Sequence, residues 1–161
     1  MTDSSFQVLP LDLETFRPLF ETDDLELRRR GIRRVTATAK PGFPCRVSLE
    51  DADVGETVLL LNHPHHDTDG PYRASGPIYV RERAEPARLA AGELPPVVDG
   101  RRLSVRAYSA TGMMRMAAVC EAGELRGKLD ELFADPKVAY LNVHNALPGC
   151  FSCRVERAEA A

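Results

Sequence analysis

The sequence lacks several features that would assign it to a protein class at once. Tryptophan is absent, and only three of the 21 basic residues are lysine. No apolar run approaches the ~20 residues that cross a bilayer. The segment from Met1 to Pro10 has no basic region followed by an apolar core, so no secretion signal is expected. These absences argue against a membrane protein and predict a cytoplasmic one, in which four cysteines stay reduced: Cys45, Cys120, Cys150 and Cys153.

The bulk composition is that of an ordinary globular protein. Hydrophobic residues make up 43% and charged residues 28% of the 161 residues. This length predicts a single domain over 1–161, with 157–161 as a frayed tail. The net charge of -3 argues against broad, non-specific nucleic-acid binding, which depends on basic surface, although it leaves a local basic site open; no nucleic-acid partner is expected.

Strand patterns outnumber helical patterns and are separated mostly by short turns. Apolar residues recur at helical spacing in 13–20, where Pro18 limits the helix to two short pieces, and again in 124–134. A further turn of helix over 23–30 has acids first and arginines last, as the helix dipole favours. The pattern predicts an α+β fold, a mainly antiparallel sheet of about six to eight strands with two or three short helices. Strands are expected at 6–11, 32–38, 45–49, 56–62, 78–83, 103–108, 114–120, 138–145 and 151–156.

The most informative strand is the one before the last turn. In it, apolar residues alternate with a phenol, an amide and an imidazole, so one face should pack on a core and the other should be polar. Two other strands carry arginine and tyrosine in the same alternation. If their apolar sides share one core, the polar sides line one face. This face would suit an anion, because the planar guanidinium of arginine forms bidentate hydrogen bonds with carboxylate or phosphate. The alternative is a solvated sheet face. The polar residues concerned are Tyr79, Arg81 and Arg83, Ser104, Arg106 and Tyr108, and Tyr140, Asn142 and His144.

A second cluster of chemistry-bearing residues falls in a long polar loop expected over 63–77. Three of the four histidines lie there, and imidazole serves as a metal ligand or as an acid or base near neutral pH. With His144 and Cys150 they could hold zinc or iron, but their spacing matches no standard site, and a solvated loop is the alternative. Cys150 and Cys153 should face opposite sides of a strand, which argues against a redox pair. The loop histidines are His63, His65 and His66.

Three stretches of the chain resemble one family. They are Lys40-Pro41-Gly42-Phe43-Pro44-Cys45-Arg46-Val47-Ser48-Leu49, Tyr72-Arg73-Ala74-Ser75-Gly76-Pro77-Ile78-Tyr79-Val80-Arg81 and His144-Asn145-Ala146-Leu147-Pro148-Gly149-Cys150-Phe151. Together they are similar to the bacterial "domain of unknown function 1203" family. The resemblance implies a small bacterial protein and no particular activity or cofactor.

Two functions of different classes follow from the residues. The first is an enzyme or binding protein for a small anionic metabolite, and the second is a non-catalytic ligand-binding or oligomerisation module that uses the polar face to form, for example, a homodimer. Whether the protein is an enzyme, which cofactor it uses and whether it binds a metal stay open, and no metal site is assigned. The candidate catalytic residues are His144, His65 and Cys150; the candidate ligand-binding residues are Arg73, Ser75, Arg81, Arg106, Tyr108, Tyr140 and Asn142.

Overall fold

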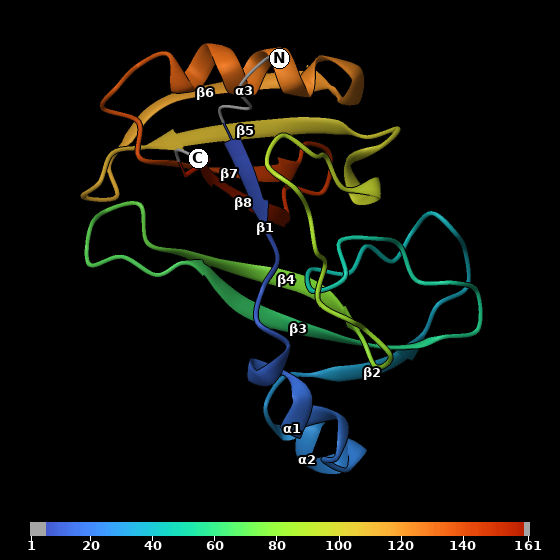
Figure 1. Cartoon of the computed structure of the whole chain (residues 1–161). Helices are drawn as coiled ribbons and strands as arrows, with labels where there is room; N and C mark the ends of the chain where they lie inside the picture. The colour runs from blue at the N-terminus through green and yellow to red at the C-terminus, as the bar shows by residue number, and fades with distance from the viewer. Residues whose placement is uncertain (1–5, 160–161) are drawn as a thin grey trace.

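Two antiparallel sheets, one above the other, organise the chain (Figure 1). The computed structural model describes residues 6–159. The larger sheet has the strand order β1-β8-β7-β5-β6 and the smaller one the order β2-β3-β4, so the predicted α+β class is confirmed. The strands are β1 Phe6–Leu9, β2 Arg33–Thr36, β3 Thr57–His66, β4 Ala74–Arg81, β5 Arg102–Tyr108, β6 Met114–Glu121, β7 Tyr140–Asn145 and β8 Phe151–Arg157.

The helices are short, and one of the three α-helices begins at a side-chain cap. The side chain of Asp23 accepts a hydrogen bond from the backbone N–H of Glu26 and starts α2. Pro18 divides the preceding segment as expected, since a 3-10 turn comes before it and α1 is a single turn of helix. The α-helices are α1 Arg17–Phe20, α2 Asp24–Arg29 and α3 Leu125–Phe133, and the 3-10 turns are Leu13–Thr15, Pro96–Val98 and Ala122–Glu124.

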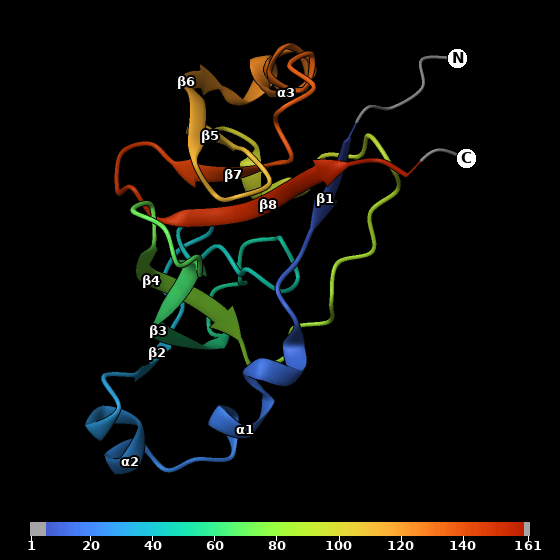
Figure 2. The same ribbon diagram turned by 90° about the vertical axis from the view of Figure 1, so that its left-hand side faces the viewer.

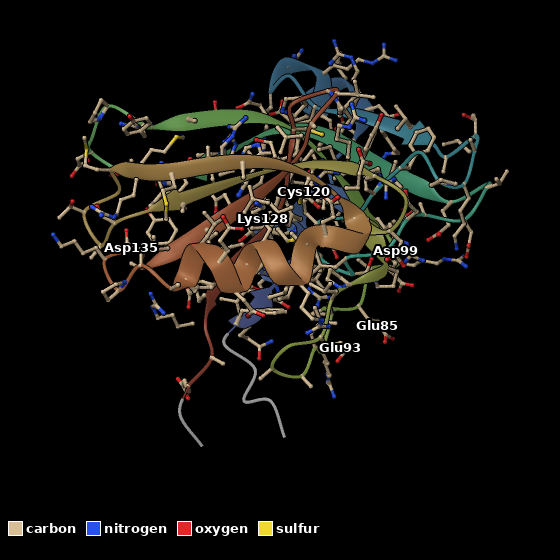
Figure 3. All side chains as sticks on the ribbon, turned by 90° about the horizontal axis from the view of Figure 1, so that it is seen from above. Glu85, Glu93, Asp99, Cys120, Lys128 and Asp135 are labelled. Carbon is tan, nitrogen blue, oxygen red and sulfur yellow. The ribbon has the colours of Figure 1, made fainter. Side chains whose placement is uncertain are left out.

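The largest apolar core lies between the five-stranded sheet and helix α3, which crosses the outer face of that sheet (Figure 3). Leu129 and Phe133 on α3 pack in the same core as Val105, Leu141 and Val155 from three adjacent strands. Burying a side chain of this size contributes about 1.5–3 kcal/mol. The apolar alternation of β5 and β7 is therefore directed to the outer face, and their polar residues face inward, toward the three-stranded sheet.

A second core fixes the three-stranded sheet. Leu59 and Leu61 of β3 and Val80 of β4 pack with Phe16 and Leu27, which come from the segment that contains α1 and α2. These two helices lie on the side of the small sheet that faces away from the large one (Figures 1 and 2). The space between the two sheets is thus bounded by the polar side of β5, β7 and β8 and by the inner side of β3 and β4.

Two expected elements differ from the structure. The strand expected over 45–49 is wrong: Cys45 makes one isolated bridge to Tyr79, and turns follow. The loop expected over 63–77 is also wrong, because β3 continues to His66 and β4 begins at Ala74, which leaves a hairpin turn of 67–73. The histidines looked like loop residues because Pro64 lies among them, and proline is usually excluded from strand interiors.

Two further expectations concern the ends of the chain. Residues 1–5, on which part of the argument against a secretion signal rests, and 160–161, the last part of the predicted tail, lie outside the described residues. Strand β8 ends at Arg157, where the tail was expected to begin. No helix within 6–159 is long and apolar enough to cross a lipid bilayer.

Candidate functional site

A β-bulge in β3 brings two neighbouring histidines against the large sheet. The pairing of β3 with β4 shifts by one residue between His63 and His66. A bulge inserts an extra residue and re-aims side chains, so neighbours no longer point to opposite faces. His65 consequently contacts His144 on β7, with ring centroids 4.9 Å apart, while His66 stacks on Tyr108 of β5 at 4.0 Å. We call the resulting group the inter-sheet cluster: His65, His66, Arg106, Tyr108, Tyr140, Asn142 and His144.

His66 is locked by two hydrogen bonds that also fix its tautomer. Its Nδ1 lies 2.8 Å from the carbonyl oxygen of Tyr72, which can only accept, so Nδ1 carries the proton. In the neutral ring the Nε2 atom then accepts from the hydroxyl of Tyr140 at 2.7 Å. Each ring nitrogen has a partner. The hydrogen bond to Tyr140 joins the end of β3 to β7 across the space between the sheets, and the one to Tyr72 ties His66 to the following hairpin turn.

His144 is held differently, because one of its nitrogens has no partner. The ring is fully buried, and Nδ1–H donates to the carbonyl oxygen of Gly149 at 3.0 Å. The Nε2 atom is then an unprotonated acceptor, and it has no hydrogen-bond partner among the described residues. Burial is the main cause that lowers the pKa of His144 to about 4, and the nearby guanidinium groups of Arg106 and Arg46 act in the same direction. The imidazole is therefore neutral at pH 7.

Unpartnered buried polar atoms concentrate around this imidazole. Buried polar groups in proteins are nearly always hydrogen-bonded, so each exception needs an explanation. His65 shares the neutral state of His144, since burial and the charge of Arg106 lower its pKa to about 4. The buried polar atoms without a protein partner are His65 Nδ1, Asn142 Oδ1, His144 Nε2, Asn145 Oδ1 and Ser152 Oγ.

The sequence-predicted residues divide into those that the structure brings together and those that it does not. The inter-sheet cluster unites two of the predicted catalytic residues, His65 and His144, with the predicted ligand-binding residues of β5 and β7. Their face is covered by β3 instead of being an open sheet surface, since Asn142 and Tyr108 are buried. The roles assigned to these residues stay predictions.

The expectation of one shared polar face is wrong for β4, because β4 belongs to the other sheet. Arg81 pairs there with Glu56 at 2.9 Å and with Glu50 at 3.4 Å, outside the inter-sheet cluster. Arg73 and Ser75 are exposed in and after the hairpin turn, where Arg73 approaches Asp67 at 4.0 Å. A face predicted from alternation alone assumes that all the strands share one sheet, and here they do not.

Next to the cluster lies a pocket of about 630 Å³ that we call the arginine pocket. Three arginines and no carboxylate line it, and most of its remaining wall is apolar. Its volume falls in the range of sites for small organic ligands. The lining residues are Gly42, Pro44, Arg46, Leu60, Pro77, Tyr79, Gly100, Arg101, Arg102, Asn145, Leu147, Pro148 and Cys150.

Arg46 is the unusual member of this wall. Only 1% of its surface is exposed, yet no carboxylate within 6–159 forms an ion pair with it. Its Nε donates to the carbonyl oxygen of Phe151 at 2.7 Å, and its Nη1 donates to the carbonyl oxygen of Pro44. Burial lowers the pKa of Arg46, and contact with the Cys150 side chain acts in the opposite direction. A buried charge without a counterion is costly, so this guanidinium favours an anion beside it.

The other two arginines of the pocket are already paired. Arg101 forms a two-pronged ion pair with Asp51, with the shorter contact at 2.6 Å, and Arg102 pairs with Glu121 at 2.7 Å near the surface. A forked arginine pair is geometrically specific, which holds the Arg101 guanidinium rigidly at the pocket wall. Hydrogen bonds from Arg101 hold the pKa of the Asp51 carboxyl below its ordinary value against the effect of burial.

Sequence reasoning missed all three arginines of the pocket. Arg46 falls in the strand expected over 45–49, and Arg101 and Arg102 precede the strand expected over 103–108. A usable signal was present: Asp99-Gly100 marks a turn directly before two arginines, and turn-borne charges beside a strand start often lie at a rim. Cys150, a predicted catalytic residue, does line the pocket.

Within residues 6–159 no group of three or more His, Cys, Asp or Glu side chains is arranged to hold a metal ion. A comparison with family models matches residues 42–157 to the family described as "Protein of unknown function (DUF1203)". No curated protein and no solved structure matches the chain. The three stretches that carried the family resemblance all reach the arginine pocket, through residues 42–46, 77–79 and 145–150.

Proposed function

Because this chain belongs to the DUF1203 family, whose description assigns no function, we propose its function from the pocket itself: the protein binds a small amphipathic anion in the arginine pocket. The anion is a carboxylate or a phosphate ester with an apolar substituent. The observation that carries this proposal is Arg46, a buried guanidinium at the wall of a 630 Å³ pocket that has no carboxylate beside it.

The charges of the wall support an anionic head group. The hydrogen-bonding partners of the Arg46 side chain are carbonyl oxygens and the Cys150 thiol, so a carboxylate or phosphate would be its first counterion. A guanidinium and a carboxylate form short, strong and often bidentate hydrogen bonds. Because Asp51 already neutralises the charge of Arg101, that arginine should attract an anion less strongly. Arg46 is therefore the principal contact for the anion.

The remaining wall supports an apolar substituent. Leu60 and Tyr79 lie on the inner side of the small sheet, and Leu147 and Pro148 close the pocket from the turn between β7 and β8. Apolar contacts of this kind contribute about 25 cal/mol for each Å² removed from water. Inorganic anions alone would leave this part of the pocket unused.

The test compares each anion with a neutral compound that carries the same phenyl group, by isothermal titration calorimetry. Phenylacetate is set against phenylacetamide, and phenyl phosphate against phenol. We expect one of the anions to bind at least tenfold more tightly than its neutral analogue, a difference of about 1.4 kcal/mol. Equal affinity of both anions and their analogues, or no binding of either anion, would overturn the proposal.

Three variants connect the binding to the pocket. Arg46→Met keeps most of the side-chain volume and removes the charge, so it should abolish the preference for the anion. Arg102→Gln is a second test of the preference for the anion, which should be reduced. This substitution does not disturb the interior, since Arg102 is exposed. Arg17→Gln is the matched control for Arg102→Gln, because Arg17 is similarly exposed, pairs with Glu14 and lies outside the pocket, so the affinity should not change.

A further inference from the structure

Cys150 is chemically set apart from the other cysteines of the chain. It is half-buried and lines the arginine pocket, whereas Cys45, Cys120 and Cys153 are buried. Cys120 lies on β6 in the core beneath α3 (Figure 3), and burial raises the pKa of its thiol. Burial also raises the pKa of Cys153 to about 12. Since the thiolate is the reactive form, these two thiols are inert, and a reagent in the pocket meets Cys150.

The surroundings of Cys150 suit a negatively charged reaction partner. The amide Nδ2 of Asn145 lies 3.4 Å from its sulfur, and the sulfur is also in contact with the guanidinium of Arg46. Positive charge beside the sulfur attracts an anionic reagent to it. In addition, Asn145 is only 5% exposed and lines the pocket with an Oδ1 atom that has no protein partner. The wall therefore presents an unused acceptor beside the sulfur and the arginines.

We propose that Cys150 is a thiol–disulfide exchange site for small disulfides that carry carboxylates, and that it holds one half of such a molecule as a mixed disulfide. The inference rests on the proposed function, because the anion that the pocket binds is here the carboxylate of the disulfide. Arg46 and the other two arginines select the negative charge, and Cys150 supplies the reaction.

The exchange is balanced without any further reactant. The Cys150 thiolate attacks one sulfur of the incoming disulfide, a new S–S bond to Cys150 forms, and the original S–S bond breaks. The departing half leaves as a thiolate and takes a proton from solvent. Cys150 is oxidised to the disulfide level while the leaving half is reduced to a thiol. An external thiol reverses the reaction by the same steps.

The mixed disulfide has no internal thiol to resolve it. Cys153 is three residues away, but it is paired with Val143 and belongs to the core under α3, on the opposite side of the sheet from the pocket. Two cysteines can form a disulfide only when their Cβ atoms approach each other at about 3.5–4.5 Å with the right orientation. The adduct on Cys150 therefore persists until a second small thiol arrives.

The experiment uses three symmetric disulfides of similar size and different charge: 3,3′-dithiodipropionate, bis(2-hydroxyethyl) disulfide and cystamine. Intact mass spectrometry follows the addition of one half of each reagent to the reduced protein, and every rate is divided by the rate with 2-mercaptoethanol, a neutral thiol. We expect the normalised rate for dithiodipropionate to exceed that for the neutral disulfide by about tenfold and that for cystamine by more. Equal normalised rates, or a faster reaction with cystamine, would overturn the inference.

Variants locate the reaction and its selectivity. Cys150→Ser should abolish the added mass, whereas Cys153→Ser should not, and an adduct that survives in Cys150→Ser contradicts the assignment. Arg102→Gln should reduce the preference for dithiodipropionate, and Arg17→Gln, outside the pocket, should preserve it.

Phenylacetate titrated into the reduced parent protein separates the two proposals. If phenylacetate binds but the exchange shows no preference for the anionic disulfide, the inference about Cys150 is refuted and the proposed function stands. Absence of both anion binding and selective exchange refutes both. Protection of Cys150 from dithiodipropionate by phenylacetate is the expected result, because the two would occupy the same pocket.

Discussion

The buried imidazole of His144 should make the protein lose stability as the pH falls from neutral. The unfolded chain protonates this histidine near its ordinary pKa of 6.5, whereas the folded protein protonates it only near pKa 4. Between these pH values the unfolded state binds the extra proton, so folding becomes less favourable as the pH decreases. The stabilising effect of the lowered pKa is fully present above pH 6.5 and is lost progressively toward pH 4.

The magnitude follows from the difference between the two pKa values. One pKa unit corresponds to about 1.4 kcal/mol, so a shift from 6.5 to about 4 lowers the free energy of unfolding by about 3 kcal/mol across this range. The structural reason is that a proton on Nε2 would place a third positive charge in a buried region beside the guanidinium groups of Arg46 and Arg106. His65 shifts in the same direction, so the parent protein should lose more than this.

The assay is urea denaturation at a series of pH values from 7.5 to 4, followed by circular dichroism, on the parent and on His144→Asn. Asparagine keeps an N–H donor for the carbonyl oxygen of Gly149 and removes the titrating ring. The variant is expected to be less stable at pH 7.5 because of lost packing, but its free energy of unfolding should depend less steeply on pH by about 3 kcal/mol over the range. Parallel pH profiles for the two proteins would refute the reasoning.

Two further substitutions test contacts that position the site. Tyr140→Phe removes the hydroxyl that donates to His66 Nε2, and leaving that buried acceptor unpaired should cost about 1–3 kcal/mol in urea denaturation. Gly112→Ala should destabilise by about 1–3 kcal/mol in the same assay, because φ is +80° there and the new Cβ would lie 2.7 Å from Thr68 Oγ1.

Each of these substitutions has a matched control elsewhere in the chain. Tyr72→Phe removes a hydroxyl from an exposed ring and should change the free energy of unfolding by less than about 0.5 kcal/mol. Gly123→Ala adds a Cβ that meets no atom within 4 Å at a glycine whose φ is not positive, so it should be close to neutral. The contact arguments fail if either test variant is as stable as its control.

Local pattern predicted those parts of the fold that depend on local physics. The alternation of Leu141 and Val143 with Asn142 and His144 assigned the two faces of β7, because side chains on a strand alternate regardless of what covers them. Alternation could not show that β3 would cover the polar face. That outcome depends on the pairing and stacking of strands far apart in sequence. It also depends on a bulge between His63 and His66, which no residue type in the sequence indicates.

The candidate site was predictable to a smaller extent. Cys150 and the histidines were identified by their chemistry, which is visible in the sequence. Arg46 was not, because its hydrogen-bond acceptor at Phe151 lies 105 residues further along the chain. Whether an arginine is a solvated surface residue or a buried charge depends on such distant partners, and eighteen arginines offered no basis for choosing among them.

The pairing of β1 with β8 has a consequence for how the protein folds. These are the first and last strands of the described residues, and they lie side by side, with Phe6 opposite Arg157 (Figure 2). The small sheet, which spans only 33–81, can form from a contiguous stretch as soon as that stretch has been synthesised. The large sheet cannot be completed until β8 has left the ribosome, and joining β8 to β1 then closes a loop from Phe6 to Arg157, an entropic cost that slows folding. During that interval the arginine pocket is incomplete, because Cys150 and the turn that closes the pocket are synthesised after the small sheet.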